Sequence, residues 1–496
     1  MHRRISVVAL FTAIALAACS TDTVVSPLRV PTGPKFAVST PESGDYVVMM
    51  NGNGISKDFT AKVALLGGKV TWSHAGAGIA AVSGLTNAGA VDLASTSGVA
   101  DVQADIEIGL ETPLAAAEAD ASDLSGPSIN SVTNPTTAGR YNWQWNMRAI
   151  GANDAWAAGK LGSAGVTVAI LDTGLDYDIP DLNGLVDLSR STSFVAADNA
   201  LRATYFSARN DVTDFNGHGT NVATQVSSKA AALAGVTSKT TLIGVKVLGR
   251  TGSGSSSGVL AGVLWAADHG ANVANMSLGG GFSKAGAGGF GSLINRTFNY
   301  AKQKGMLIVV SAGNSGIDLQ HNGNQYVTYC DAPHVICVSA TGLPTWTGNA
   351  DAIAYYTNFG RNSASIAAPG GNQALNAAGT AALVTPGWPW AINPITNPLG
   401  NDIASWVWSY CPKDRIAGLT AAGVPVLTVC AAGNRLSGFI GTSQASPHVA
   451  GLAASLMAEY GTGQPEQIKH LIEKSAVLID PAYGRGRISV SNAFGL

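Results

Sequence analysis

From Trp143 onward, short apolar runs alternate with Ala-rich stretches that are compatible with helices. Five runs have the length and composition of buried strands: Val166–Leu171, Leu242–Leu248, Val273–Leu278, Met306–Val310 and Val335–Ser339. The helix-compatible stretches between them are Asn221–Leu233, Ser257–His269 and Leu293–Lys304. This alternation predicts an α/β fold, in which a mostly parallel central sheet is covered by helices on both faces. Such folds bind their ligands at the carboxyl ends of the strands.

A smaller unit precedes this region, at about residues 44–108. Its order of elements reads βαββαβ, from an apolar run at Tyr46–Met50 to a last strand candidate at Val99–Ile108. This order predicts a small α+β domain with an antiparallel sheet. The next segment, 109–141, is rich in Ala, Ser, Asp, Pro and Thr. We interpret it as an exposed, cleavable linker.

The N-terminus has the pattern of an export signal. A basic start is followed by the apolar stretch Ile5–Ala18, which is short and ends in small residues. The ending Leu16–Cys19 resembles a bacterial lipobox, which implies removal of a signal peptide, 1–18, and a lipid on Cys19. Residues 19–43 would then form a polar tether. We therefore expect an exported protein, either a cell-envelope lipoprotein or, with an ordinary signal peptide, an extracellular one.

The net charge and the cysteine content give information on binding partners and on the redox compartment. The net charge of −2 argues against nucleic acid as a partner. No internal apolar run is long enough to span a membrane, so a lipid on Cys19 would be the only membrane contact. The other four cysteines suggest two disulfides in an oxidising compartment. We favour Cys330–Cys337 and Cys411–Cys430, because each pair is local in sequence; four free thiols are the alternative. No Cys/His spacing fits a zinc site.

Three polar motifs stand where a strand ends or a helix begins. Asp172 directly follows Val166–Leu171, and a buried acid needs a hydrogen-bonding task such as orienting a histidine. His218 lies between two glycines at the start of a helical stretch, a setting that suits proton transfer. Ser443, in the segment Gly441–Gly451, lies between small residues at the start of another helix. A serine hydroxyl needs a neighbouring base to become a nucleophile. The order Asp, His, Ser is one of the chain orders of an acyl-transfer triad.

Together these segments resemble the Asp, His and Ser signatures of the subtilisin-like serine proteases, over about residues 145–495. The resemblance implies a serine endopeptidase with its catalytic domain at 142–496 and no cofactor for the chemistry. It also implies the roles: Asp172 orients the base, His218 is the base and then the acid, and Ser443 attacks.

The resemblance further implies a peptide-binding cleft between two strand segments, to which a substrate adds as a β-strand. The residues expected at this cleft are Gly252, Ser253, Gly254, Ser277, Leu278, Gly279, Gly280, Ala312 and Gly313. The expected partners are peptide or protein substrates and, in cis, the unit at 44–108, which resembles the inhibitory propeptides of this family. That unit would template folding, occupy the cleft and be removed by a cut within 109–141. We expect a monomer.

An acyl-transfer site also needs a hydrogen-bond donor for the oxyanion, and the sequence offers two Ala-Gly-Asn segments. Asn314 follows the run Met306–Val310 and has the order found in the family. Asn434 lies nine positions before Ser443, in a stretch without a family counterpart. We therefore favour Asn314, with the backbone N–H of Ser443 as the second donor.

Two features depart from the family pattern. The first is an insertion at about 372–440, which contains Trp388, Trp390, Trp406 and Trp408 together with Cys411 and Cys430. It is either a disulfide-stapled subdomain whose aromatic residues form their own core or a flap that faces the substrate. The second is Asp181, which matches a calcium ligand of the family. One carboxylate is too few to establish a calcium site, so we favour a structural acid and assign no metal. A structural calcium ion bound at Asp181 is the alternative.

Two other functions fit parts of the sequence. A catalytically inactive envelope lipoprotein on a protease scaffold would be favoured by loss of a triad residue or of Asn314, and none is lost. An esterase would favour a Gly-x-Ser-x-Gly motif, whereas residues 441–445 read Gly-Thr-Ser-Gln-Ala. The sequence therefore predicts an exported serine endopeptidase that is processed from an inactive precursor.

Overall fold

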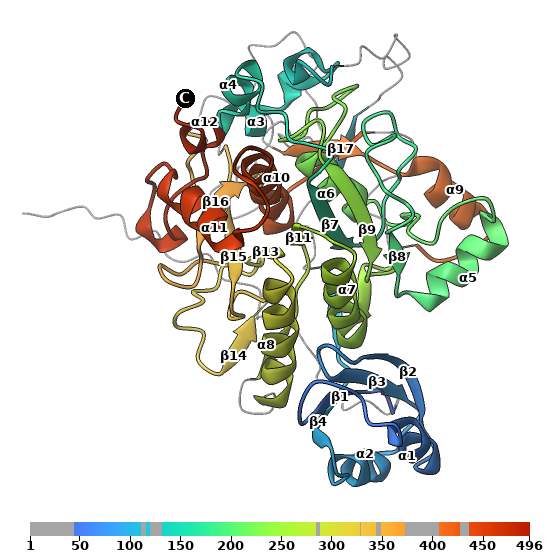
Figure 1. The fold of residues 1–496 in the computed structure, drawn as a ribbon. Coiled ribbons are helices and arrows are strands. Elements are labelled where there is room, and N and C mark those ends of the chain that lie inside the picture. Colours follow the sequence, from blue (N-terminus) through green and yellow to red (C-terminus); the bar gives the residue numbers. More distant parts are fainter. Residues whose placement is uncertain are drawn as a thin grey trace, which may run out of the picture.

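The computed structural model describes residues 44–110, 116–119, 131–283, 288–327, 329–343, 349–372, 406–426 and 436–496. The signal peptide, Cys19 and the tether lie outside these ranges, as do Asn434 and Cys430. Figure 1 shows a small unit, coloured blue, beneath two helices of a larger α/β unit. In the part of the chain that is described, no helix is both long and apolar enough to cross a membrane.

The larger unit is built on a seven-stranded sheet in the order β16-β15-β13-β11-β7-β9-β8. Every neighbouring pair in it is parallel. Its strands are β7 (Thr167–Asp172), β8 (Thr192–Ser193), β9 (Thr241–Lys246), β11 (Val273–Met276), β13 (Leu307–Ser311), β15 (Val335–Thr341) and β16 (Ile366–Pro369). The predicted α/β fold is therefore confirmed.

Both faces of the central strands of this sheet are buried, which explains why these strands are mostly apolar. Along β7, Val168 and Ile170 join one core, whereas Ala169 and Leu171 join the other. The first core is covered by α6 (His218–Val226) and α10 (Thr442–Tyr460), and the second by α7 (Ser256–Asp268) and α8 (Gly288–Gln303). Because Asp172 is the last residue of β7, it lies at the carboxyl end of the sheet.

Shorter elements surround this framework. The remaining helices are α3 (Trp145–Ala149), α4 (Ala152–Ala157), α5 (Ala196–Tyr205), α9 (Lys413–Ala421), α11 (Pro465–Lys474) and α12 (Val490–Ala493). The small strands are β5 (Glu107–Gly109), β6 (Ala116–Ala119), β10 (Ser253–Ser255), β12 (Gly281–Ser283), β14 (Gln325–Val327), β17 (Val407–Tyr410) and β18 (Leu436–Phe439). Two of them, β5 and β6, lie in or beside the predicted linker, so that segment is partly strand rather than wholly exposed chain.

The N-terminal unit has the expected βαββαβ order. Its elements are β1 (Tyr46–Met50), α1 (Phe59–Leu65), β2 (Lys69–His74), β3 (Ile79–Ser83), α2 (Asn87–Ala94) and β4 (Val99–Ala104). The strands form an antiparallel sheet in the order β2-β3-β1-β4. Residues such as Val48, Phe59 and Leu93 give this unit a core of its own.

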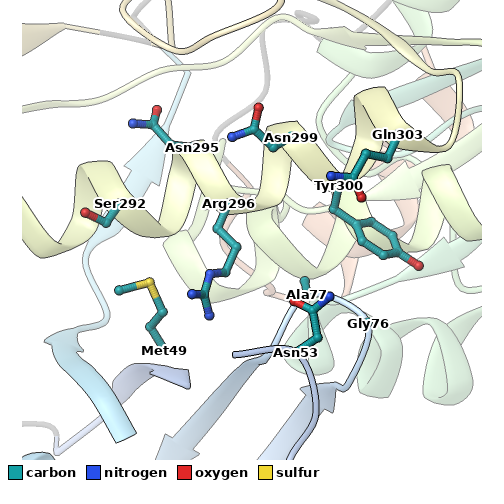
Figure 2. A pocket seen from close by; sticks show the side chains of 10 residues that line it. All are labelled: Met49, Asn53, Gly76, Ala77, Ser292, Asn295, Arg296, Asn299, Tyr300 and Gln303. Atoms are coloured by element: carbon teal, nitrogen blue, oxygen red, sulfur yellow. The ribbon is translucent and has the colours of Figure 1, made fainter. Parts of the chain in front are cut away.

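The N-terminal unit meets the larger unit along α7 and α8. Arg296 points from α8 towards the small sheet and donates to the backbone oxygen of Met50 at 2.6 Å (Figure 2). Beside this contact is a cavity of about 420 Å³, lined by Met49 and Ala77 on one side and by Asn295 and Tyr300 of α8 on the other. None of the predicted catalytic residues lines this cavity, so it belongs to the interface between the units.

The helix predicted at Asn221–Leu233 is wrong at its C-terminal end. Helix α6 starts earlier, at His218, and ends at Val226. The residues that follow form a loop around the buried carboxylate of Asp181, which accepts their backbone N–H groups. These N–H groups are therefore satisfied outside a helix, which the apolar periodicity of the segment could not reveal.

The described part of the insertion packs against the catalytic unit. Trp406 and Trp408 are fully buried in the main core, where Trp408 lies edge-on to Trp143 with ring centroids 5.3 Å apart. The expectation of a separate aromatic core is therefore wrong for these two tryptophans. Trp388 and Trp390 lie outside the described residues.

One of the two expected disulfides is described completely. Cys330 and Cys337 are joined by a disulfide across a sequence separation of seven residues. Cys411 is also disulfide-bonded, and its predicted partner, Cys430, lies outside the described residues.

Candidate active site

Asp172 and His218 form a buried pair at the carboxyl end of β7. The Nδ1 atom of His218 lies 2.8 Å from Oδ1 and 3.0 Å from Oδ2 of Asp172. The side chain of His218 is only 2% exposed. Because two carboxylate oxygens face Nδ1, this nitrogen carries the proton, and Nε2 is left as the basic atom. The pair therefore has the arrangement of an oriented general base.

A second aspartate holds the turn that presents His218. Both Asn216 and Gly217 donate their N–H groups to Oδ1 of Asp214, each at 2.9 Å. Oδ2 of Asp214 accepts from the hydroxyl of Thr220 at 2.6 Å, which links the turn to the first turn of α6. The glycine after His218 is needed for packing, because a Cβ at that position would lie 2.2 Å from a backbone oxygen of the loop after β7.

Ser443 lies in the first turn of α10, as expected for a nucleophile at a helix N-terminus. Its Oγ donates to the backbone oxygen of Ser277 at 3.3 Å, and no hydrogen bond joins it to His218 among the described residues. Pro447 cannot supply the usual helical N–H to the carbonyl of Ser443. The hydroxyl of Ser277 donates to that carbonyl instead, at 2.8 Å. Ser277 thus holds Ser443 by two hydrogen bonds.

Asn314 lies beside the start of α10. Its Oδ1 atom accepts the backbone N–H of Thr442 at 2.8 Å and the hydroxyl of Thr442 at 2.9 Å. The hydrogen-bonded oxygen leaves Nδ2 as the donor of this amide. A Cβ at Gly441 would lie 3.3 Å from Nδ2, so the glycine keeps the space beside this donor open. The amide thus lies beside the first turn of α10, which carries Ser443.

The chain's own segment 107–110 lies as a strand in the predicted cleft. Strand β5 pairs antiparallel with β10 on one side. On the other side Gly109 and Gly279 exchange two backbone hydrogen bonds of 3.1 Å, and the N–H of Leu110 donates to Gly252 at 2.8 Å. The two cleft segments therefore already bind an extended peptide, in the manner the sequence predicted for a substrate.

The structure brings most of the predicted cleft residues together. Gly252, Ser253, Gly254, Gly279 and Gly280 lie along residues 107–110, while Ser277 and Gly313 surround Ser443 and Asn314. Leu278 and Ala312 are buried in the same core cluster as Ile108 of β5. Asn434 lies outside the described residues.

Asp181 acts as a structural anchor. Its Oδ1 accepts the N–H groups of Ala231 and Ala232, at 2.6 and 3.0 Å, and its Oδ2 accepts that of Leu233 at 3.0 Å. Burial raises the pKa of this carboxyl to about 6, against the lowering effect of these donors. No cluster of metal-binding side chains occurs within the described ranges.

Sequence reasoning missed three residues that support the site. Asp214 and Thr442 are each near a predicted catalytic residue, and their proximity in sequence was a usable signal. Asn358 had no such signal: its amide donates to Ala312 at 2.8 Å and accepts from Ser315 at 3.0 Å, which fixes the chain on both sides of Asn314.

Comparisons with known proteins give a consistent result. The sequence profile of the subtilase family (peptidase S8) matches residues 163–496. A thermophilic serine proteinase of Bacillus sp. (strain AK1) is 29% identical over 371 residues, which are 74% of this chain and 70% of that protein. Thermitase of Thermoactinomyces vulgaris is 27% identical over 356 residues, which are 71% of this chain and 95% of thermitase.

Solved structures agree on the fold. The epidermin leader peptide processing serine protease of Staphylococcus aureus superimposes with a TM-score of 0.65 and 22% identity, over 91% of this chain and 98% of that one. Fervidolysin of Fervidobacterium pennivorans gives a TM-score of 0.62 and 23% identity, over 91% of this chain and 60% of its own. The family profile covers most of the chain, and the relatives are serine proteinases. The chain therefore belongs to the subtilase family and is a serine endopeptidase.

Proposed function

We propose that Asp172, His218 and Ser443 are the catalytic triad and that Asn314 is the side-chain oxyanion donor. The observation that carries this assignment is the buried 2.8 Å contact between Asp172 and Nδ1 of His218. This contact leaves Nε2 of His218 as the base. Ser443 lies in the first turn of α10, and Thr442 orients the amide of Asn314 by a hydrogen bond.

The chemistry follows from these positions. The hydroxyl of Ser443 leaves Ser277 and gives its proton to Nε2 of His218 as Oγ bonds to the scissile carbonyl carbon. The oxyanion is stabilised by Nδ2 of Asn314 and the N–H of Ser443. Collapse breaks the C–N bond, and the leaving amine takes the proton from His218. Water then repeats the sequence on the acyl-enzyme, with His218 again as base and acid.

Covalent labelling tests the nucleophile. A fluorophosphonate should label the processed enzyme, and the label should disappear in Ser443→Ala but persist in Ser455→Ala, a matched change in the same helix. Persistence of the label in Ser443→Ala would contradict the assignment of the nucleophile, and absence of the label from the wild type would favour the inactive-scaffold alternative. Hydrolysis of a peptide library by the wild type then defines the preferred sequences.

The N-terminal unit is proposed to be an inhibitory propeptide. The support is that residues 107–110 fill the peptide cleft and that Asp105 binds the N-terminus of α7. The chain is bound in the cleft up to Leu110, whose N–H donates to Gly252. It is bound again from Ala116, which pairs with β18, the strand that leads into Ser443. We therefore place the maturation cut between Leu110 and Ala116.

Self-processing has a direct test. In a host without other proteases, Ser443→Ala should remain full length, whereas the wild type should yield a product that starts between residues 111 and 116. Normal maturation of Ser443→Ala would contradict self-processing. Export, with a lipid on Cys19, is tested separately by fractionation and palmitate labelling of the wild type and Cys19→Ser.

A further inference from the structure

Arg250 lies on the loop between β9 and β10, two residues before the peptide-binding residue Gly252. Its backbone N–H donates to Oδ2 of Asp198 at 2.9 Å, and its guanidinium donates to Oδ1 of the same carboxylate at 2.9 Å. Asp198 lies in the first turn of α5, where its side chain is fully buried. The backbone and the side chain of Arg250 are therefore both bound to α5.

The same guanidinium also binds the insertion. Its Nε atom donates to the backbone oxygen of Pro425 at 2.9 Å. The insertion is held in turn by α9, whose Arg415 lies 3.1 Å from Asp176 on the loop after β7. A Cβ at Gly418 would lie 3.1 Å from the ring of Phe206, the residue that follows α5, and Figure 1 shows α9 on the same side of the molecule as α5. The loop between β9 and β10 is thus held between two supports, α5 and the insertion.

The loop that Arg250 holds leads directly into a peptide-binding edge. The backbone oxygen of Gly252 accepts the N–H of Leu110 at 2.8 Å, and β10 pairs with β5 over the next three residues. The turn that presents His218 is held separately, by the carboxylate of Asp214. A displacement of the loop would therefore move the edge to which a peptide adds before it moved the proposed base.

A second cation neutralises the buried carboxylate without Arg250. The Nζ atom of Lys246 lies 2.8 Å from Oδ2 of Asp198, and both side chains are fully buried. The ammonium group also donates to the backbone oxygen of Thr213 at 2.8 Å. Because Asp198 keeps this partner, the fold should tolerate loss of the guanidinium, which is 24% exposed. Lys246 therefore balances the buried charge, and Arg250 is left with the task of holding the loop.

We propose that Arg250 is a positioning residue for substrate binding, whose guanidinium fixes the peptide-binding edge at residues 252–255 by joining the preceding loop to α5 and to the insertion. The substrates that depend on it are extended polypeptides with several residues before the scissile bond, because only such chains reach this edge. This inference rests on the proposed catalytic roles. It gives the insertion a function that needs no contact with the substrate: the segment at Pro425 supports the edge from behind.

Substrate length provides the test of this role. Mature wild type and Arg250→Ala are compared on two 4-nitrophenyl esters of the same amino acid, one with that residue alone and one with five further residues before it. We expect the ratio of kcat/KM for the long ester to that for the short ester to fall about tenfold or more in Arg250→Ala. The change should lie mainly in KM for the long ester, since the edge is no longer pre-organised for binding. An unchanged ratio would overturn the proposal.

Two further variants separate positioning from loss of a surface arginine. Arg202 also lies on α5, is 20% exposed and pairs with Asp211 at 2.6 Å, so Arg202→Ala is the matched control and should keep the wild-type ratio. An equal fall in Arg202→Ala would overturn the proposal.

Arg250→Lys keeps the charge but not the planar fork that binds two acceptors at once, so its ratio should lie between those of the wild type and Arg250→Ala. No recovery by lysine would show that the ion pair with Asp198 does not hold the edge, and full recovery would show that the bond to Pro425 contributes nothing. Either result would overturn the proposal as stated.

Failure of the proposed triad gives a different result. If a fluorophosphonate fails to label the mature wild type and neither ester is hydrolysed, the catalytic roles fail. If the wild type is labelled and Arg250→Ala keeps the wild-type ratio, only the role of Arg250 fails. A lower ratio in Arg250→Ala, together with an unfolding midpoint like that of the parent in the Ser443→Ala background, supports both statements.

Discussion

Thr442 fixes the side-chain amide of Asn314 through two hydrogen bonds, from its backbone N–H at 2.8 Å and from its hydroxyl at 2.9 Å. The same hydroxyl accepts the N–H of Gly313 at 3.0 Å. Both bonds from Thr442 end on Oδ1, so they determine the orientation of the amide. Thr442 is therefore a positioning residue that acts through the proposed oxyanion donor.

Replacing the hydroxyl of Thr442 should lower kcat more than it changes KM. Thr442→Val keeps the shape but removes one of the two bonds to Asn314, at a cost of about 1 kcal/mol or a five- to tenfold loss of kcat. Thr442→Ser should retain activity close to the wild type. Asn314→Ala should lose about 10²–10³-fold, the loss found when one such donor is removed from a subtilisin. Steady-state kinetics on one peptide measure all three.

A double mutant separates positioning from simple destabilisation. If Thr442 acts through Asn314, Thr442→Val should have little further effect on kcat in the Asn314→Ala background. Full additivity of the two losses would contradict the coupling. Thermal unfolding of each variant in the Ser443→Ala background shows whether the fold itself has changed.

Asp105 should contribute to retention of the cleaved N-terminal unit. Its carboxylate accepts the hydroxyl of Ser256 at 2.6 Å and the N–H of Ser257 at 2.8 Å, at the positive end of α7. Asp105→Ala should raise the dissociation constant of the cleaved unit about 10- to 100-fold, because hydrogen bonds to a charged group are lost. Activity should then appear earlier after processing. Asp92→Ala, on the exposed side of α2, is the control, and equal activation times for both variants would argue against this clamp.

Local sequence patterns predicted the central sheet, and they led to the proposed triad, because both depend on short segments. Strand β7 is a continuous apolar run that ends in Asp172, and the run itself indicates burial on both faces. The glycines around His218 and the small residues around Ser443 are also local signals. The pattern of residues 143–339 thus predicted both the fold and the edge of the sheet at which the site lies.

Long-range pairings could not be predicted in this way. Strand β18 pairs with β6, more than 300 residues away in the chain, and neither segment has a strong strand pattern. Trp408 lies in the main core, and its backbone oxygen accepts the side-chain amide of Gln225, more than 180 residues earlier in the chain. The helix end at Val226 depends on the carboxylate of Asp181, 45 residues earlier. Each of these depends on a partner that the local sequence does not identify.

Asp181 should stabilise the protein without calcium. Its two carboxylate oxygens accept hydrogen bonds from three backbone N–H groups. In Asp181→Asn the amide nitrogen would face one or more of these donors, so we expect a loss of about 2 kcal/mol or more in the free energy of unfolding. Denaturant unfolding in the Ser443→Ala background measures this loss. A chelator should leave the unfolding midpoint of the parent protein unchanged; a large drop on chelation would show that a metal stabilises this chain.

His448 should make the fold sensitive to acid. Its Nδ1 lies 2.7 Å from the backbone oxygen of Gln444, and its Nε2 lies 2.8 Å from Nδ2 of Asn146, so the buried ring is neutral with the proton on Nδ1. Burial lowers the pKa of His448 to about 4, from 6.5. The unfolded chain therefore binds a proton in this window that the folded chain does not, and stability is lost as the pH falls from about 6.5 to about 4. The loss amounts to about 3 kcal/mol.

The matched variant for this prediction is His448→Gln, whose amide can still donate and accept. In the Ser443→Ala background, the parent should lose more free energy of unfolding between pH 7 and pH 4.5 than His448→Gln does, by about 2–3 kcal/mol. Urea titrations at both pH values measure the difference, and carboxylates shared by the two proteins cancel in it. If the two proteins lose the same amount, His448 is not the group that binds the extra proton on unfolding, and another buried group must cause the acid sensitivity.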